Sequence, residues 1–182
     1  RQPLFSYANV PYKINPLEAL LEDPKNTVCY DSELAAKIEQ RVSDLGGDGK
    51  LMLNAVGDVH QVNLMEKWLV PLLGKLGNLV VDGGIWLNTQ RPEWNDANNA
   101  LVGQGLSMVT LYYMRRYICF GQQLLEGQSA PVELSGEVSL WLQETAKALA
   151  AASWLADDGA ITPQQRFDLL LDLGQAASRY RQ

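Results

Sequence analysis

The sequence predicts a mainly α-helical protein of stacked αα-hairpins with one small β-hairpin. Apolar residues recur at spacings of three and four over most of the chain, which is the period of an amphipathic helix. Five such segments are joined by mostly short connections, so consecutive helices are expected to pack as antiparallel neighbours. A single segment, with two short apolar runs around a Gly-Asp pair, has the pattern of a β-hairpin.

The composition is typical of one folded domain. The chain has 182 residues, of which 47% are hydrophobic and 20% charged, and this balance excludes a disordered tail. It carries 15 Lys and Arg against 21 Asp and Glu, so a net charge of −6 argues against a nucleic-acid partner. With two cysteines and one histidine, neither a disulfide scaffold nor a histidine-rich metal site is expected.

No segment has the pattern of a signal peptide or of a membrane-spanning helix. Residues 1–30 lack the continuous apolar core of a signal peptide. The stretch 97–114 has no charged residue and approaches a membrane span in length. Its polar side chains and two glycines would be costly in lipid, so we interpret it as part of a buried helix. We therefore expect a cytoplasmic protein.

Residues 1–31 are expected to form an irregular lead-in on the surface of a single helical domain, residues 32–182. Four prolines in the lead-in prevent long helices and strands, because proline lacks a backbone N–H and has a fixed φ. One or two helical turns are predicted at 17–22. The chain also begins at Arg1 without a methionine, which suggests a piece of a longer protein.

The domain is expected to begin with a helix over 32–45. Asp31 and Ser32 are suitable N-cap residues, and Gly46 follows the last apolar position. Residues 50–62 follow as the predicted β-hairpin, because a Gly-Asp pair suits its turn.

A second helix is predicted from Asn63, which with Glu66 forms a pair like a capping box. Pro71 lies within the apolar stripe of this helix and predicts a kink or a break near Val70. Residues 79–96 are then the longest irregular connection. Loops of this length in a compact domain are more often functional than shorter ones.

Three further helices are predicted, over 97–126, 136–156 and 163–180. The first is apolar nearly all round, so it is expected to be packed on every side. The last has Thr162 as its N-cap and Gln165 in the capping-box position. Its inward-facing stripe is predicted to consist of Phe167, Leu170, Leu171, Gly174 and Ala177.

The segment 86–105 carries the strongest functional signal, because it places tryptophans among amides, an arginine and carboxylates. A pyranose ring has an apolar C–H face that stacks on an indole. Its rim of hydroxyls needs fixed donors and acceptors. The segment is also expected to lead into a helix N-terminus, which favours anions. The candidate substrate-binding residues are Trp86, Arg91, Glu93, Trp94 and Asn99.

Part of this segment is a run of motif residues at fixed spacing: Glu93-Trp94-Asn95-Asp96, then Asn99, Val102-Gly103 and Gly105. The run resembles the DWNDG…VG…G segment of inverting cellobiose phosphorylases and related six-hairpin glycosidases. It departs from that pattern at Glu93, where the family has Asp, and at Ala97, where it has Gly. The resemblance is confined to 86–105 and implies a catalytic (α/α)6 toroid. Five predicted helices are too few for six hairpins, so the chain is expected to be a partial toroid, a fragment of a larger catalytic domain.

The resemblance implies that Trp94 is a sugar platform and Asp96 the general acid. Such an acid must stay protonated near neutral pH, and an apolar wall of Trp94 and Trp86 would raise the pKa of Asp96 by desolvation. An inverting hydrolase also needs a second carboxylate about 6.5–9.5 Å away, whereas in a phosphorylase inorganic phosphate attacks as co-substrate. Glu93 is too close in sequence to be that carboxylate. The two activities therefore stay open, and no other cofactor is expected.

A non-catalytic interpretation stands beside this one. Asp96 would be the N-cap of the helix over 97–126, and Trp86 and Trp94 would be core aromatics. The chain would then be a helical interaction or structural domain whose tryptophan-rich loop packs against the rest of a parent chain or a partner. The enzyme hypothesis expects an oligosaccharide or glycoside as partner and places 86–99 in an open cleft. The alternative expects that segment to be buried, or flat and apolar.

Overall fold

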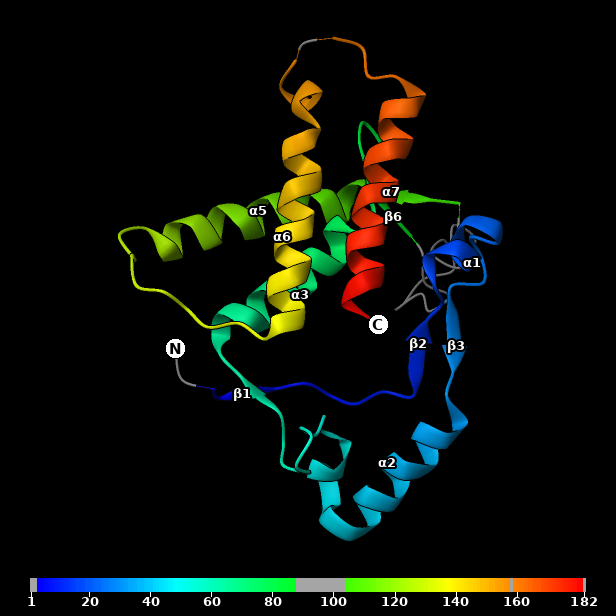
Figure 1. Cartoon of the computed structure of the whole chain (residues 1–182), viewed down its shortest axis with the longest axis vertical. Helices are drawn as coiled ribbons and strands as arrows, with labels where there is room; N and C mark the ends of the chain where they lie inside the picture. Colours follow the sequence, from blue (N-terminus) through cyan, green and yellow to red (C-terminus); the bar gives the residue numbers. More distant parts are fainter. Residues whose placement is uncertain (1–2, 88–103, 158, 182) are drawn as a thin grey trace.

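The computed structural model describes residues 3–87, 104–157 and 159–181. Helices dominate this part, as the apolar spacing predicts, and small antiparallel sheets join them (Figure 1). The α-helices are α1 (Leu17–Glu22), α2 (Ser32–Leu45), α3 (Leu64–Leu76), α5 (Met108–Leu125), α6 (Gly136–Ala151) and α7 (Pro163–Tyr180), with 3-10 helices η1 (Gly46–Lys50) and η2 (Ser153–Ala156).

Three small sheets pair the strands, and two of them, β1 with β4 and β6 with β7, join segments that are not neighbours in the chain. In each of them the paired strands are antiparallel and at most three residues long. The strands are β1 (Phe5–Ser6) with β4 (Gln61–Val62), β2 (Tyr12–Ile14) with β3 (Val28–Tyr30), and β5 (Leu79–Val80), β6 (Gly84–Trp86) and β7 (Leu106–Ser107) in that order.

The core lies where α3 packs against the antiparallel pair α6 and α7 (Figure 1). Leu73 of α3 and Leu173 of α7 are fully buried, and Trp141 of α6 is nearly so. The helices α6 and α7 form one αα-hairpin, which confirms that element of the predicted architecture. The partial toroid of stacked hairpins stays a prediction.

The proline-rich lead-in contains short elements, none longer than the six residues of α1. The helical turns predicted at 17–22 are therefore confirmed. The helix α2 also has the predicted caps, because the Asp31 side chain accepts from the Leu34 N–H at 2.9 Å and Gly46 ends the helix with φ 70°. The Asp31 carboxylate also pairs with Lys13 Nζ at 2.6 Å. This bond lowers the pKa of Asp31 below its usual value.

The β-hairpin predicted over 50–62 is confirmed only at its turn. The Asn54 side chain accepts from the N–H groups of Val56 and Asp58, and Leu53 forms a bridge with Val59. The His60 N–H still donates to the Met52 carbonyl at 2.8 Å, and farther out both arms pair with the lead-in. The free edge of the lead-in supplies the hydrogen-bond partners that a longer hairpin would have used.

The prediction of a capping box at α3 is half correct. The Asn63 side chain accepts from the Glu66 N–H at 3.0 Å. The Glu66 carboxylate, only 4% exposed, turns to another helix and accepts from the Ser135 N–H at 2.7 Å and from Ser135 Oγ at 3.0 Å. The break predicted at Pro71 is wrong, since α3 continues through it as one helix. Buried leucines on both sides of the proline offset the lost hydrogen bond.

The irregular connection predicted over 79–96 is wrong for its first part, because β5 and β6 form a tight hairpin. The turn of this hairpin contains Asp82 and Gly83. The Gly83 N–H donates to the Val80 carbonyl at 3.0 Å, and Gly84 adopts φ 139°. Asp82 is a non-glycine residue with positive φ, 61°, and a conformation of this kind is costly for most side chains.

The helix predicted over 97–126 is wrong in its start and in its burial. Residues 97–103 lie outside the described part, and β7 occupies Leu106–Ser107, so α5 begins at Met108. Its N-cap is Ser107, whose hydroxyl accepts from the Thr110 N–H at 3.1 Å. One face of α5 is open to solvent instead of packed: Val109 is 64%, Tyr112 61% and Phe120 57% exposed. No helix in the described ranges is long and apolar enough to cross a membrane.

The last two predicted helices are confirmed, but the side of α7 that faces the core differs from the prediction. α6 ends at Ala151, and η2 follows it over Ser153–Ala156. The capping box of α7, Thr162 with Gln165, is present as predicted. However, the core-facing side of α7 carries Leu169, Leu173 and Ala176, which the predicted inward stripe does not include. Of that stripe, Ala177 is also buried, and all five positions line a cavity.

Candidate functional site

A cavity of about 440 Å³ lies among α1, α3, α7 and the β5–β6 hairpin. Its walls are mainly apolar. Three glycines, Gly74, Gly77 and Gly174, contribute to them, and a Cβ atom at Gly74 would meet only Trp141 Cη2, at 3.7 Å. The larger aliphatic and aromatic lining residues are Leu17, Leu20, Leu21, Val70, Phe167, Leu170 and Leu171.

Aromatic rings form part of the cavity wall. Trp86, at the end of β6, is half-buried and lines the cavity. Its backbone N–H donates to the Asn78 carbonyl at 2.8 Å. Trp141 and Tyr180 also line it and stack on each other, with ring centroids 4.2 Å apart and planes 21° apart. Of the predicted substrate-binding residues, Trp86 is therefore placed at a cavity.

The remaining motif candidates fall outside the described residues, namely Arg91, Glu93, Trp94, Asp96 and Asn99. Their predicted roles, including Asp96 as general acid, stay predictions. The residues on either side of 88–103 are described, and they lie side by side. Ile85 pairs with Ser107, Trp86 pairs with Leu106, and the Leu87 N–H donates to the Gly105 carbonyl at 2.9 Å. The residues that flank 88–103 therefore pair with each other, and one of them, Trp86, lines the cavity.

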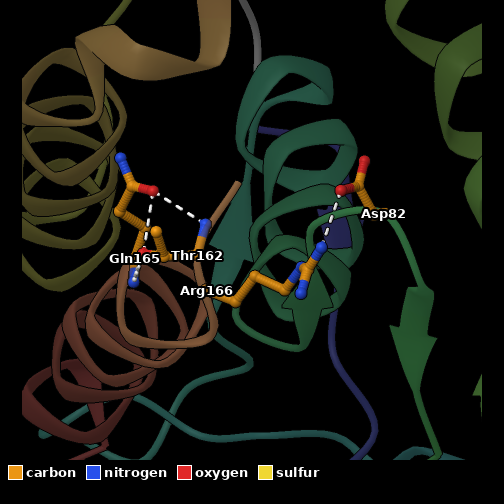
Figure 2. Close-up of polar contacts among 4 residues, drawn as sticks. All are labelled: Asp82, Thr162, Gln165 and Arg166. Atoms are coloured by element: carbon orange, nitrogen blue, oxygen red, sulfur yellow. Dashed lines mark hydrogen bonds and ion pairs between the residues drawn. The ribbon is translucent and has the colours of Figure 1, made fainter. Parts of the chain in front are cut away.

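An ion pair joins the β5–β6 turn to α7. Arg166 Nη2 lies 2.9 Å from Asp82 Oδ2, and Figure 2 shows this pair beside the capping box of α7. In that box the Thr162 N–H donates to the Gln165 side chain at 2.8 Å, and the Gln165 N–H donates back to Thr162 Oγ1 at 3.2 Å. The turn that leads to Trp86 is thus tied to the first turn of α7. This contact helps to position the hairpin.

Polar groups also line the cavity, contributed by Asn78, Tyr180 and Arg181. Burial raises the pKa of Tyr180, and the nearby Glu66 and Glu137 carboxylates raise it further, so this phenol is neutral at neutral pH. Burial lowers the pKa of Arg181, which nevertheless remains charged, because an unperturbed guanidinium titrates far above neutrality. The cavity therefore offers one cation and uncharged hydrogen-bonding groups.

A buried carboxylate lies behind this wall, and the sequence gives no sign of its partners. Both oxygens of Glu66 bind Ser135 at the start of α6, so Glu66 serves as a cap for that helix. Tyr7 lies near it. Burial, followed by the negative charge of Glu66, raises the pKa of the Tyr7 phenol to about 12. Lys67 lies over the Tyr7 ring, with Nζ 4.1 Å from the centroid, and donates to the Ser6 carbonyl at 2.6 Å.

Metal ligands do not gather in the described part of the chain. No group of three His, Cys, Asp or Glu side chains there could hold an ion. Comparison with known proteins adds no assignment, because no protein-family model matches the chain and no curated protein matches it. The likeness to six-hairpin glycosidases therefore rests on the motif in 86–105.

Proposed function

We propose that the chain is part of a carbohydrate-active domain that binds an oligosaccharide or glycoside and acts on its glycosidic bond. One observation of the fold supports this most directly. The motif-bearing segment starts and ends at the β6–β7 pair, and Trp86, which precedes it, lines the cavity. Residues that adjoin a small sheet beside a cavity are often binding or catalytic residues.

The proposed chemistry is general-acid catalysis with inversion. Asp96 donates a proton to the leaving oxygen, and Trp94 stacks on the sugar, while Arg91, Glu93, Asn99 and Trp86 contact the substrate. The attacking group is a water molecule in a hydrolase or inorganic phosphate in a phosphorylase. No second carboxylate is assigned, since Glu66 is engaged with Ser135.

Sugar binding tests the substrate class directly. Cellobiose and longer cello-oligosaccharides are titrated into the full chain, with tryptophan fluorescence and calorimetry as readouts. Trp86→Ala is expected to weaken binding at least about tenfold, since a ring that stacks on a ligand carries much of its contact energy. Trp154→Ala is the matched control, because Trp154 packs beside the Ala148–Leu169 cluster and does not line the cavity. Equal effects of the two changes would argue against Trp86 as a sugar contact.

The acid assignment needs a separate test. Asp96→Asn removes the proton and keeps the size of the side chain, so it is expected to abolish glycoside turnover while leaving the unfolding midpoint unchanged. The assay uses the protein that carries this chain, with Asp58→Asn as a control for the same change in an exposed turn. Full turnover by the Asp96 variant would refute the assignment.

A second candidate function is an interaction domain, favoured by the open face of α5. Val109, Tyr112, Tyr113, Phe120 and Leu124 are all more than half exposed on this helix. Exposed apolar and aromatic side chains grouped in this way are typical of a surface that a partner covers.

The two exposed cysteines provide a test of this second function, because Cys119 lies on α5 and Cys29 on β3. If the rest of a parent chain covers α5, alkylation of Cys119 is expected to be much slower in the longer protein than in residues 1–182. Cys29 is the internal reference. If alkylation of Cys119 and Cys29 slows by the same factor in the longer protein, the rest of the parent chain does not cover α5.

A further inference from the structure

We propose that the cavity beside α7 is a binding site for a small amphipathic carboxylate, with its apolar body in the cavity and its anionic head at Arg181. The proposal goes beyond the sugar chemistry above, because it concerns a ligand without a sugar. It uses only described residues of α1, α3 and α7. Size, the chemistry of the walls and the charge of the rim support it in turn.

The size and the walls of the cavity suit an aliphatic or aromatic body. A volume of about 440 Å³ lies within the range of small-molecule sites, roughly 300–1,000 Å³. The walls come mainly from leucine, valine and aromatic side chains. Two of them remain substantially exposed, Leu21 at 55% and Phe167 at 49%, so the cavity opens to solvent between α1 and α7. A ligand with an apolar body would remove this surface from water.

The rim provides the charge that selects an anion. Arg181 lines the cavity, and its guanidinium makes none of the three salt bridges found among the described residues. The neighbouring Arg179 is different, because it pairs with Glu144 on α6. Arg181 is exposed at the rim, so an incoming carboxylate can reach its guanidinium and form a charge-assisted hydrogen bond.

Arg181 lies at the C-terminal end of α7, where only its side chain favours an anion. Arg181 is the C-cap of α7, and its own N–H donates to the Ser178 carbonyl at 3.1 Å. The C-terminal end of a helix carries partial negative charge, which would repel a carboxylate. Anion binding at this place therefore depends on the guanidinium, and loss of that group should reverse the preference for an anionic ligand.

The test compares three probes with one chain length: octanoate, octanol and octylamine, each well below its micellar concentration and titrated into the full chain by calorimetry at neutral pH. Octanoate is expected to bind at least about tenfold more tightly than octanol. A hydrogen bond between charged groups raises affinity by a factor of about 10 to 100. Octylamine is expected to bind most weakly. Equal affinity for octanoate and octanol, or no binding of either, would overturn the proposal.

Two variants separate the head from the body. Arg181→Gln is expected to remove the advantage of octanoate over octanol, and Arg115→Gln is the matched control, an exposed arginine of α5 that does not line the cavity. Gly74→Leu is expected to fill the cavity and abolish binding of both probes. If the Leu variant does not fold, Gly74→Ala replaces it, and a smaller loss of affinity for both probes is then expected. A preference for octanoate that survives Arg181→Gln would refute the role of the guanidinium.

Discussion

Two glycines in helix interiors should respond in opposite ways to the same substitution. Gly74 lies in α3 and Gly121 in α5. A Cβ atom at Gly74 would meet only Trp141 Cη2, at 3.7 Å, which is an ordinary contact. A Cβ atom at Gly121 would lie 2.6 Å from Trp68 Cη2 and closer still to Cζ2, which no real contact allows.

The magnitudes follow from these contacts. Replacing glycine by alanine inside a helix stabilises it by about 0.8–1 kcal/mol, and Gly74→Ala should keep that gain. At Gly121 the same gain is set against overpacking, which costs about 1–3 kcal/mol. The Trp68 ring has little freedom to move, because it stacks on Tyr117 at 4.9 Å and the Tyr117 hydroxyl donates to the Trp68 carbonyl at 3.1 Å. A contact this short with a fixed ring places the cost at the upper end of that range, so we expect Gly121→Ala to destabilise the chain by about 1–2 kcal/mol.

Urea and thermal unfolding of the full chain measure both changes. For a chain of this size each kcal/mol shifts the melting temperature by about 2–4 °C, upward for Gly74→Ala and downward for Gly121→Ala. The near-ultraviolet circular dichroism of Trp68 should change only in the Gly121 variant. A Gly121→Ala chain as stable as the parent would refute the packing of α5 on Trp68. A destabilised Gly74→Ala chain would refute the open space beside Trp141.

Three further predictions follow from the polar contacts. Glu66→Gln removes a charged acceptor from the Ser135 N–H and hydroxyl, and should lower the free energy of unfolding by about 1–3 kcal/mol in urea; an unchanged value would contradict the capping role. In Asp82→Asn the asparagine tolerates positive φ but the ion pair with Arg166 is lost, so the free energy of unfolding should fall by no more than about 1 kcal/mol. Asp82→Ala should lower it further, because alanine is strained at positive φ. Equal stabilities of the two variants would argue against that strain. Because the pKa of Tyr7 is raised to about 12 in the folded chain, the phenol of the unfolded chain ionises first, and the free energy of unfolding should fall as pH rises from 10 toward 12. Tyr7→Phe should reduce this loss. An identical alkaline profile of the variant would exclude a contribution of Tyr7.

Signals that act over a few residues were enough to predict much of the fold. The caps at Asp31, Asn63 and Thr162 each form a hydrogen bond to a backbone N–H three residues later, so the local sequence contains both partners. The two helices of the αα-hairpin are equally local. The predicted candidate Trp86 also lies at a cavity, although local patterns do not show which residues form the other walls.

Predictions failed where the partner is distant in sequence. Glu66 looked like one half of a local capping box, but its carboxylate binds Ser135, which is 69 residues away. The helix over 97–126 starts later than predicted, because pairing with β6 draws Leu106–Ser107 into a strand. Its hydrophobicity predicted burial all round, yet burial depends on which elements stand beside a helix, and one face of α5 has no neighbour among the described elements.

The sequence by itself determined the helical class and most helix boundaries, because propensity and capping are properties of short segments. The tertiary structure alone decided which face of α7 enters the core and which lines the cavity. It also placed Trp86 and Arg181 on the walls of the same cavity, although they are far apart in the chain. Both outcomes depend on α1, α3 and the β5–β6 hairpin meeting α7, and such contacts arise only when the chain buries its apolar surface as a whole.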